Sequence, residues 1–275
     1  MSARNQVNAA GRKPKLGQNF LVDPQAARRI VDALGDIGNS VVIEIGPGRG
    51  ALTKTLAQRA GRLVAVEFDR VLAEQLHEGF AGKPNVQIVQ GNFLDISLSA
   101  FLTSRGAGTS ERAKVVGNIP YYITSDILLR LFEQQESVDT IVVMVQREVA
   151  DRVVAEPGSR DYGLLTVTAQ LFADVERLFT LPPDAFRPPP QVHSSVLRLR
   201  IAPKAQALGV DSREFLTFCK FAFAQKRKTL FNNLRGKFSS DETRNVLISA
   251  HVRSDVRAEA LSVKQLAEIY RNLRA

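Results

Sequence analysis

The chain has 275 residues, of which 44% are hydrophobic, so it can bury a sizeable core and is too apolar for a disordered protein. No apolar run approaches the roughly 18–20 residues that span a bilayer, and the N-terminus lacks the apolar stretch of a secretory signal. The single cysteine excludes an internal disulfide. We therefore expect a cytoplasmic protein without membrane contact. The net charge of +9 indicates either a polyanionic partner or simply a soluble surface.

Between residues 41 and 145 short β-branched runs alternate with stretches of helical spacing. Such alternation implies crossover units and a parallel sheet with helices on both faces, so we predict an α/β, Rossmann-like fold. The expected strands are Val41–Ile45, Leu63–Val66, Val86–Val89, Lys114–Gly117 and Thr140–Val145, and the expected helices are Gly50–Ala60, Val71–Phe80 and Ser125–Gln135.

The pattern changes after residue 150. Gly163–Phe172 has helical spacing, whereas Asp174–Phe179 and Val192–Ile201 are strand-like. Two late strands can pair as an antiparallel hairpin at the edge of the sheet. Leu181–Gln191 lies between them and contains five prolines, so no regular structure is expected there.

The C-terminal part is expected to be helical and basic. Ser212–Leu234 is predicted to form one long helix, and Asp241–Ala275 is predicted to form shorter ones. Residues 203–275 carry a net charge of +7, and residues 1–22 contain basic but no acidic side chains. We therefore predict three regions, namely a basic N-terminal segment at 1–22, a larger α/β domain at 23–202 and a small all-α domain at 203–275.

The sequence EIGPGRG, residues 44–50, lies between an expected strand and an expected helix. Glycines there allow a tight turn and a close ligand approach to the helix N-terminus. Glu67 follows about 20 residues later and can accept both hydroxyls of a ribose. The spacing is not GxGxxG, which disfavours a nicotinamide oxidoreductase, and the Glu44 carboxylate suits a cationic amino-acid tail better than a pyrophosphate. The loop therefore favours S-adenosylmethionine over NAD, the structural alternative being a simple linking turn.

The sequence NIPY, residues 118–121, follows another expected strand at the same edge of the sheet. The exocyclic amine of adenine is a weak nucleophile, because its lone pair is delocalised into the ring. The side-chain oxygen of Asn118 and the carbonyl of Pro120 could accept hydrogen bonds from that amine, and Tyr121 could stack on the base. The motif predicts adenine methylation without a metal, although an isolated NxPY is usually an ordinary turn.

With these motifs the chain resembles the small-subunit ribosomal RNA adenine dimethyltransferases, the bacterial family linked to kasugamycin sensitivity. The resemblance covers nearly the whole chain, and it implies that 23–202 is the S-adenosylmethionine-binding catalytic domain and that the segment 1–22 contributes to its cofactor site. It is carried by Gly17–Leu21 (GQNFL), Glu44–Gly50, Glu67, Gly117–Tyr121 (GNIPY), Phe186–Val192 (FRPPPQV) and Gln225–Leu230 (QKRKTL). It implies dimethylation of the N6 amines of two adjacent adenines in small-subunit rRNA, with S-adenosylmethionine as cofactor and the immature small ribosomal subunit as partner.

The resemblance also implies roles for single residues. Phe186 is expected to stack on the target adenine opposite Tyr121, completing a catalytic set with Asn118 and Pro120. Asn92 stands where the family usually has aspartate, and Gln191 stands where it usually has a basic residue. The residues expected to bind the cofactor are Asn19, Leu21, Gly46, Gly48, Glu67, Asn92 and Asn118.

Basic side chains of the C-terminal region are candidates for RNA contact. These are Lys220, Lys226, Arg227, Lys228 and Arg235, and the alternative is a solvated helix face. The three histidines are scattered and show no metal-ligand spacing, so no metal is expected.

Two other functions remain open alongside the dimethyltransferase. One is a large-subunit rRNA adenine methyltransferase of the antibiotic-resistance type, whose core motifs would be much the same. The other is a non-catalytic ribosome assembly factor on the same scaffold, which the intact NIPY motif argues against. We expect the protein to be a monomer.

Overall fold

One mixed sheet of seven strands organises residues 18–103 and 112–274, the part of the chain that the computed structural model describes. The strand order is β4-β3-β2-β5-β6-β9-β7, and two further strands, β1 and β8, pair with each other. Most of the predicted basic segment at 1–22 lies outside the described residues. No helix in the described ranges is both long and apolar enough to cross a bilayer.

Five strands of the sheet run parallel, as the apolar runs predicted. Each predicted strand lies within two residues of the observed one at either end, because a continuous β-branched run is typical of a strand buried on both faces. The parallel strands are β2 (Val41–Ile45), β3 (Arg62–Glu67), β4 (Val86–Gln90), β5 (Ala113–Asn118) and β6 (Val138–Gln146).

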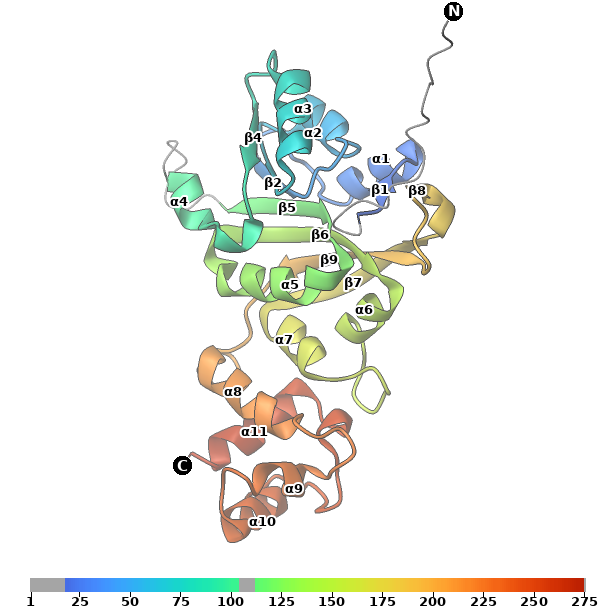
Figure 1. The fold of residues 1–275 in the computed structure, drawn as a ribbon. Helices are drawn as coiled ribbons and strands as arrows, with labels where there is room; N and C mark the ends of the chain where they lie inside the picture. The colour runs from blue at the N-terminus through green and yellow to red at the C-terminus, as the bar shows by residue number, and fades with distance from the viewer. Residues whose placement is uncertain (1–17, 104–111, 275) are drawn as a thin grey trace, which may run out of the picture.

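Helices cover both faces of the sheet, which confirms the α/β, Rossmann-like class (Figure 1). Buried side chains of α1 (Pro24–Asp32) and α2 (Thr53–Arg59) cluster with Val42 on one face. The other face packs on helices that include α5 (Thr124–Glu133). The remaining helices of this region are α3 (Arg70–Phe80), α4 (Leu98–Thr103), α6 (Arg147–Val153) and α7 (Leu164–Phe172).

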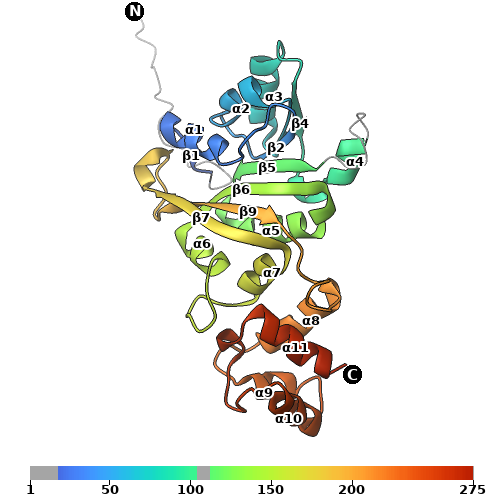
Figure 2. The same ribbon diagram turned by 180° about the vertical axis from the view of Figure 1, so that it is seen from behind.

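The two late strands form the predicted antiparallel edge, with β9 (Ser194–Ile201) between β6 and β7 (Ala173–Leu181) (Figure 2). The proline-rich stretch between them is not wholly irregular, because β8 (Phe186–Arg187) pairs with β1 (Phe20–Leu21). This small ladder fixes the start of the described chain beside the sheet.

The single long helix predicted for 212–234 is wrong. The chain forms α8 (Ser212–Ala222), leaves the helix and resumes as α9 (Leu230–Leu234). The side-chain amide of Asn233 donates hydrogen bonds to the carbonyls of Ala222, at 2.8 Å, and Gln225, at 3.2 Å. These bonds satisfy carbonyls that a continuing helix would otherwise use. Two further helices follow, α10 (Ser240–Ser249) and α11 (Val263–Asn272).

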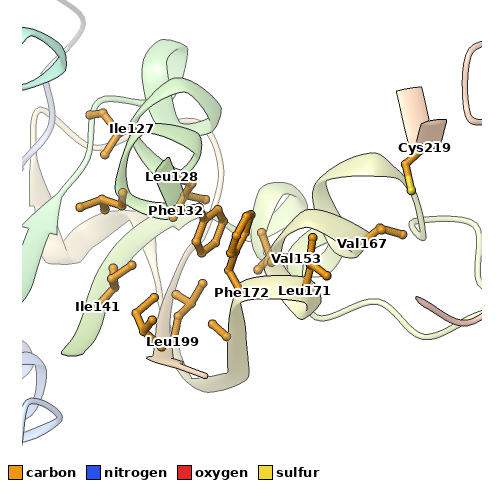
Figure 3. Close-up of a cluster of buried hydrophobic side chains, with 14 of the residues drawn as sticks. Ile127, Leu128, Phe132, Ile141, Val153, Val167, Leu171, Phe172, Leu199 and Cys219 are labelled. Carbon is orange, nitrogen blue, oxygen red and sulfur yellow. The ribbon is translucent and has the colours of Figure 1, made fainter. Parts of the chain in front are cut away.

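The C-terminal helices pack on α7 through apolar side chains. Phe132 of α5 stacks on Phe172 of α7 with ring centroids 5.5 Å apart, and Cys219 of α8 lies near Val167 of α7 (Figure 3). Phe215 of α8 is fully buried in the same cluster. One hydrophobic cluster thus runs from the sheet into the C-terminal helices, while the predicted boundary near residue 203 stays a prediction.

Candidate active site

A pocket of about 260 Å³ opens at the carboxyl ends of the parallel strands. The chain proceeds from β2 to β3 and β4 in one direction and then crosses to β5 and β6 on the other side of β2. Such a reversal of strand order leaves a crevice where open α/β sheets bind ligands. The pocket walls come from residues 18–21 and from the loops that follow β2, β3, β4 and β5.

The glycine loop after β2 folds against the N-terminal segment. Gly46 and Gly48 have φ angles of 64° and 57°, a left-handed conformation that favours glycine. A Cβ atom on Gly48 would lie 3.0 Å from the Phe20 ring. The Arg49 guanidinium stands 4.6 Å from the centroid of the same ring. The loop and Phe20 therefore form one packed wall of the pocket.

Glu67, at the end of β3, contacts this loop through a hydrogen bond. Its Oε2 accepts a hydrogen bond of 2.9 Å from the Gly48 amide, and its Oε1 accepts one of 2.9 Å from the Asp69 amide. Burial raises the pKa of this carboxyl above its usual value. Carboxylate oxygens carry more than one acceptor site each, so both remain able to accept hydroxyl groups from a ligand in the pocket.

Glu44 places a second carboxyl at the pocket. Its side chain is buried, and Oε2 has no hydrogen-bond partner within the described residues. Burial, with the nearby Glu67 carboxyl, raises the pKa of Glu44 to about 8. A buried carboxyl with an unsatisfied oxygen suits a cationic ligand, because a positive charge would compensate the cost of ionising it. The lining of the pocket therefore fits the sulfonium and ammonium groups of S-adenosylmethionine.

Asn118 ends β5 beside the glycine loop. Its neighbour Gly117 has no space for a side chain, since a Cβ atom there would lie 2.6 Å from the carbonyl oxygen of Ile45. The Asn118 Nδ2 donates a 2.8 Å hydrogen bond to the backbone carbonyl of Asn19. A carbonyl only accepts hydrogen bonds, so the amide must present its nitrogen to Asn19. Its Oδ1 is left without a partner among the described residues and is available to a substrate.

Pro120 and Tyr121 form a rigid turn after Asn118. The Pro120 carbonyl accepts hydrogen bonds from the Ile123 amide, at 3.2 Å, and from Thr124 Oγ1, at 3.3 Å. The carbonyl predicted to bind the target amine is therefore already engaged within the turn. The half-buried Tyr121 shares a 2.7 Å hydrogen bond with Ser194 of β9, and burial raises the pKa of its phenol.

Phe186 is placed differently from the expectation that it stacks on the target base. It lies in β8 opposite Leu21 of β1, is fully buried and is not part of the pocket wall. Its ring fills the hydrophobic cluster that also contains Ile30 and Met144. A base in the pocket would not reach Phe186 in this structure, because packing beneath the β1–β8 ladder covers the ring.

The other residues predicted to be catalytic or to bind the cofactor all line the pocket, namely Asn19, Leu21, Gly46, Gly48, Glu67, Asn92, Asn118, Pro120 and Tyr121. The Asn92 oxygen accepts a 3.2 Å hydrogen bond from the Leu94 amide, and its Nδ2 donates to Asp95. The pocket wall thus includes the asparagine that stands in place of the family's aspartate, and its amide is held by the turn that follows β4.

Sequence reasoning missed two exposed aromatic residues of the pocket. Phe68 and Tyr122 are 57% and 64% exposed, and both belong to the pocket wall. Each directly follows a residue that the motifs had singled out, Glu67 and Tyr121. That adjacency was the available signal, but only the fold shows that these rings remain uncovered.

The predicted RNA-binding side chains are all exposed. Lys220 lies on α8, Arg235 lies at the end of α9, and residues 226–228 occupy the turn between the two helices. Lys226 donates a hydrogen bond to the Arg160 carbonyl, so this turn contacts the loop before α7. No group of three potential metal-ligating side chains occurs in the described ranges.

The chain is similar to known ribosomal RNA methyltransferases over nearly its whole length. A family model described as ribosomal RNA adenine dimethylase matches residues 10–275. A ribosomal RNA small subunit methyltransferase A from Koribacter versatilis (strain Ellin345) is 53% identical, with 99% of this chain and 98% of that protein covered. The same enzyme from Geobacillus thermodenitrificans (strain NG80-2) is 38% identical over 94% of this chain and 89% of its own.

Solved structures share the fold. The 23S rRNA methyltransferase ErmE is 27% identical, with a TM-score of 0.70, and the match covers 94% of this chain and all of that one. A dimethyladenosine transferase from Plasmodium falciparum is 22% identical with a TM-score of 0.77, covering 91% and 95%. The family model spans almost the whole chain, and the two relatives described above carry the small-subunit name. The chain belongs to the ribosomal RNA adenine dimethylase family.

Proposed function

We propose that this protein transfers methyl groups from S-adenosylmethionine to the N6 amines of two adjacent adenines in small-subunit ribosomal RNA, during maturation of the small subunit. The family and the 53% identity to a small subunit methyltransferase support this function over the large-subunit alternative. The observation that carries the chemistry is that Asn118 lines the pocket with its amide nitrogen bonded to Asn19, which leaves its oxygen without a partner among the described residues.

Asn118 Oδ1 would accept a hydrogen bond from the adenine amine and so draw its lone pair out of the ring. A neutral amide can accept this bond before and after the first transfer, because the secondary amine still carries one N–H. Tyr121 would stack on the base, with its hydroxyl held by Ser194. Pro120 would shape the turn, since its carbonyl is engaged by Ile123 and Thr124.

The cofactor would occupy the part of the pocket between the glycine loop and β3. S-adenosylmethionine supplies a methyl group that is already activated, so neither a metal nor a strong base is required. Glu67 would accept the ribose hydroxyls, and Glu44 would face the positive charge. Asn19, Leu21 and Asn92 would complete the cofactor contacts.

Surfaces beyond the pocket would hold the RNA. We assign phosphate contacts to the exposed turn at 226–228 together with Lys220 and Arg235. The protein would act as a monomer in the cytoplasm, and residues 203–275 would serve as an RNA-binding helical domain.

Single-turnover methyl transfer to immature small subunits, with products resolved by mass, tests this function. We expect the parent protein to produce dimethyladenine at two adjacent positions, and Asn118→Ala to bind both substrates but transfer slowly. A product that stops at monomethyladenine would overturn the dimethyltransferase assignment. Full-rate transfer by Asn118→Ala would refute the role of the amide.

A further inference from the structure

Two consecutive tyrosines stand at the pocket, and the proposed function uses only the first. Tyr122 lies in η2 (Tyr121–Ile123), the 3₁₀ turn between β5 and α5. Its side chain is 64% exposed and belongs to the pocket wall. In the described ranges it makes no hydrogen bond, ion pair or ring contact. An aromatic ring held uncovered beside a nucleobase pocket is a suitable stacking platform, because every base presents a flat face.

The turn directs the two tyrosine rings differently. A 3₁₀ helix has three residues per turn, so neighbouring side chains leave it about 120° apart. Tyr121 is held toward β9 by its hydrogen bond to Ser194, at 2.7 Å. The two rings therefore leave the turn in different directions, and we assign them to different bases.

The same turn holds the backbone of Tyr122 at a fixed position. The Ile123 amide and Thr124 Oγ1 both bond to the Pro120 carbonyl, and Thr124 is buried at the start of α5. Tyr122 has two side-chain torsions, so little conformational freedom is lost when a base stacks on it.

We propose that Tyr122 stacks on the nucleobase next to the adenine that occupies the pocket. This inference rests on the proposed function and adds a binding position to it. With two adjacent adenines as substrate, Tyr122 holds one adenine at the entrance while the other reacts. The ring thereby sets which nucleotide enters the pocket and keeps the neighbouring one unstacked from it.

Equilibrium binding of a short single-stranded RNA tests the proposal. The probe contains two adjacent adenines flanked by pyrimidines, and a second probe carries an abasic site in place of one adenine. We expect Tyr122→Ala to weaken binding of the intact probe by about 5- to 150-fold, the range of one lost base–aromatic stack. Tyr122→Phe retains the ring and should bind like the parent, as should Val71→Ala, a control of similar exposure (61%) on α3, outside the pocket wall and the proposed RNA surface.

Coupling between the two changes decides the outcome. The parent should bind the abasic probe more weakly than the intact probe. Tyr122→Ala should bind the two probes with equal affinity, because it has already lost the stacking contact. An equal abasic penalty in parent and Tyr122→Ala would overturn the proposal, as would a loss in Tyr122→Phe equal to that in Tyr122→Ala. Methylation of immature small subunits is measured in parallel. If the abasic penalty is present in the parent and absent in Tyr122→Ala, but the parent transfers no methyl groups, the proposed function is contradicted and this inference is not.

Discussion

The amide of Asn118 shows how a single contact can decide the chemistry of a side chain. Its nitrogen is committed to the Asn19 carbonyl, and this leaves the oxygen as the only group that the amide offers to the pocket. Replacing Asn118 by Ala should slow the chemical step by about 100- to 1000-fold, by analogy with the loss of a preorganised polar group at a reaction centre. Single-turnover rates at saturating RNA and cofactor report this loss directly.

The variant Asn118→Asp distinguishes two properties of this side chain, its ability to accept a hydrogen bond and its orientation by the Asn19 carbonyl. The aspartate has the same shape and accepts well, but when ionised it cannot donate to the Asn19 carbonyl. We therefore expect Asn118→Asp to show a large part of the rate loss of Asn118→Ala, with cofactor affinity measured by calorimetry as the control. Parental activity in Asn118→Asp would show that the contact with Asn19 has no orienting role.

Glu44 couples the stability of the protein to pH. Its unfolded-state pKa is near 4.5 and its folded-state pKa is about 8, so the folded state retains a proton that the unfolded state releases between these values. Stability from this group is fully present below pH 4.5 and is lost as the pH rises toward 8. Glu44→Gln cannot ionise, so it should be more stable than the parent at pH 8–9 by roughly 2–5 kcal/mol relative to the difference at pH 4.5.

Chemical unfolding of both proteins across this pH range measures the difference, and the subtraction removes the contributions of the other carboxyl groups. The same variant should bind S-adenosylmethionine more weakly, because it lacks the charge that faces the cofactor. Parallel stability curves for parent and Glu44→Gln would mean that Glu44 titrates normally in the folded protein.

At the scale of elements, the turn between α8 and α9 presents three consecutive cations to solvent. Lys226, Arg227 and Lys228 are all exposed, and Lys226 also donates a hydrogen bond to the Arg160 carbonyl, so we expect this turn to contact a phosphate backbone. Replacing all three by Ala should weaken RNA binding and reduce the log–log salt slope by roughly 0.7–0.9 for each lost contact. Titrations at several salt concentrations give the slope.

A matched control removes exposed positive charge elsewhere. Lys54 of α2 and Lys83 after α3 are exposed and lie outside the proposed RNA surface. The double variant Lys54→Ala and Lys83→Ala should change the slope much less than the triple variant. A triple variant with the parental salt slope would show that residues 226–228 are only solvated.

Elements whose signal is local could be predicted from the sequence. The parallel strands follow from apolar β-branched runs, and the glycine loop follows from its own residues. The break between α8 and α9 involves a hydrogen bond from the Asn233 side chain to the Ala222 carbonyl, a contact that local sequence patterns do not reveal. The β1–β8 ladder also escaped prediction, since two-residue strands are too short to show alternation.

The same distinction separates the site residues. Gly46, Glu67 and Asn118 lie where the strand ends predicted them, because parallel strands bring their carboxyl ends to one edge of the sheet. The burial of Phe186 could not be read from its motif, since it depends on the docking of β1. The exposure of Tyr122 likewise depends on what the rest of the chain leaves uncovered.

At the scale of the whole molecule, one hydrophobic cluster joins the sheet to the C-terminal helices. Phe215 of α8 is fully buried in it, so Phe215→Ala should destabilise the protein by about 3–5 kcal/mol. Because the cluster is continuous, we expect calorimetry to show one shifted transition. Phe221→Ala, on the same helix but 37% exposed, is the matched control and should have a much smaller effect. Two separate transitions in Phe215→Ala would indicate that the C-terminal helices unfold independently.

The contact between Asn19 and Asn118 links positions 99 residues apart through a main-chain oxygen, which every amino acid provides. Evolution can therefore vary the side chain at position 19 without disturbing the orientation of Asn118. Cleavage of the peptide chain between β1 and α1 would have a larger effect than a change of side chain at position 19. A nicked protein could retain its folded core while Asn19 loses its position beside Asn118. We expect such a protein to melt normally yet fail to transfer methyl groups, so limited proteolysis at this junction would act as a switch on catalysis and not on folding.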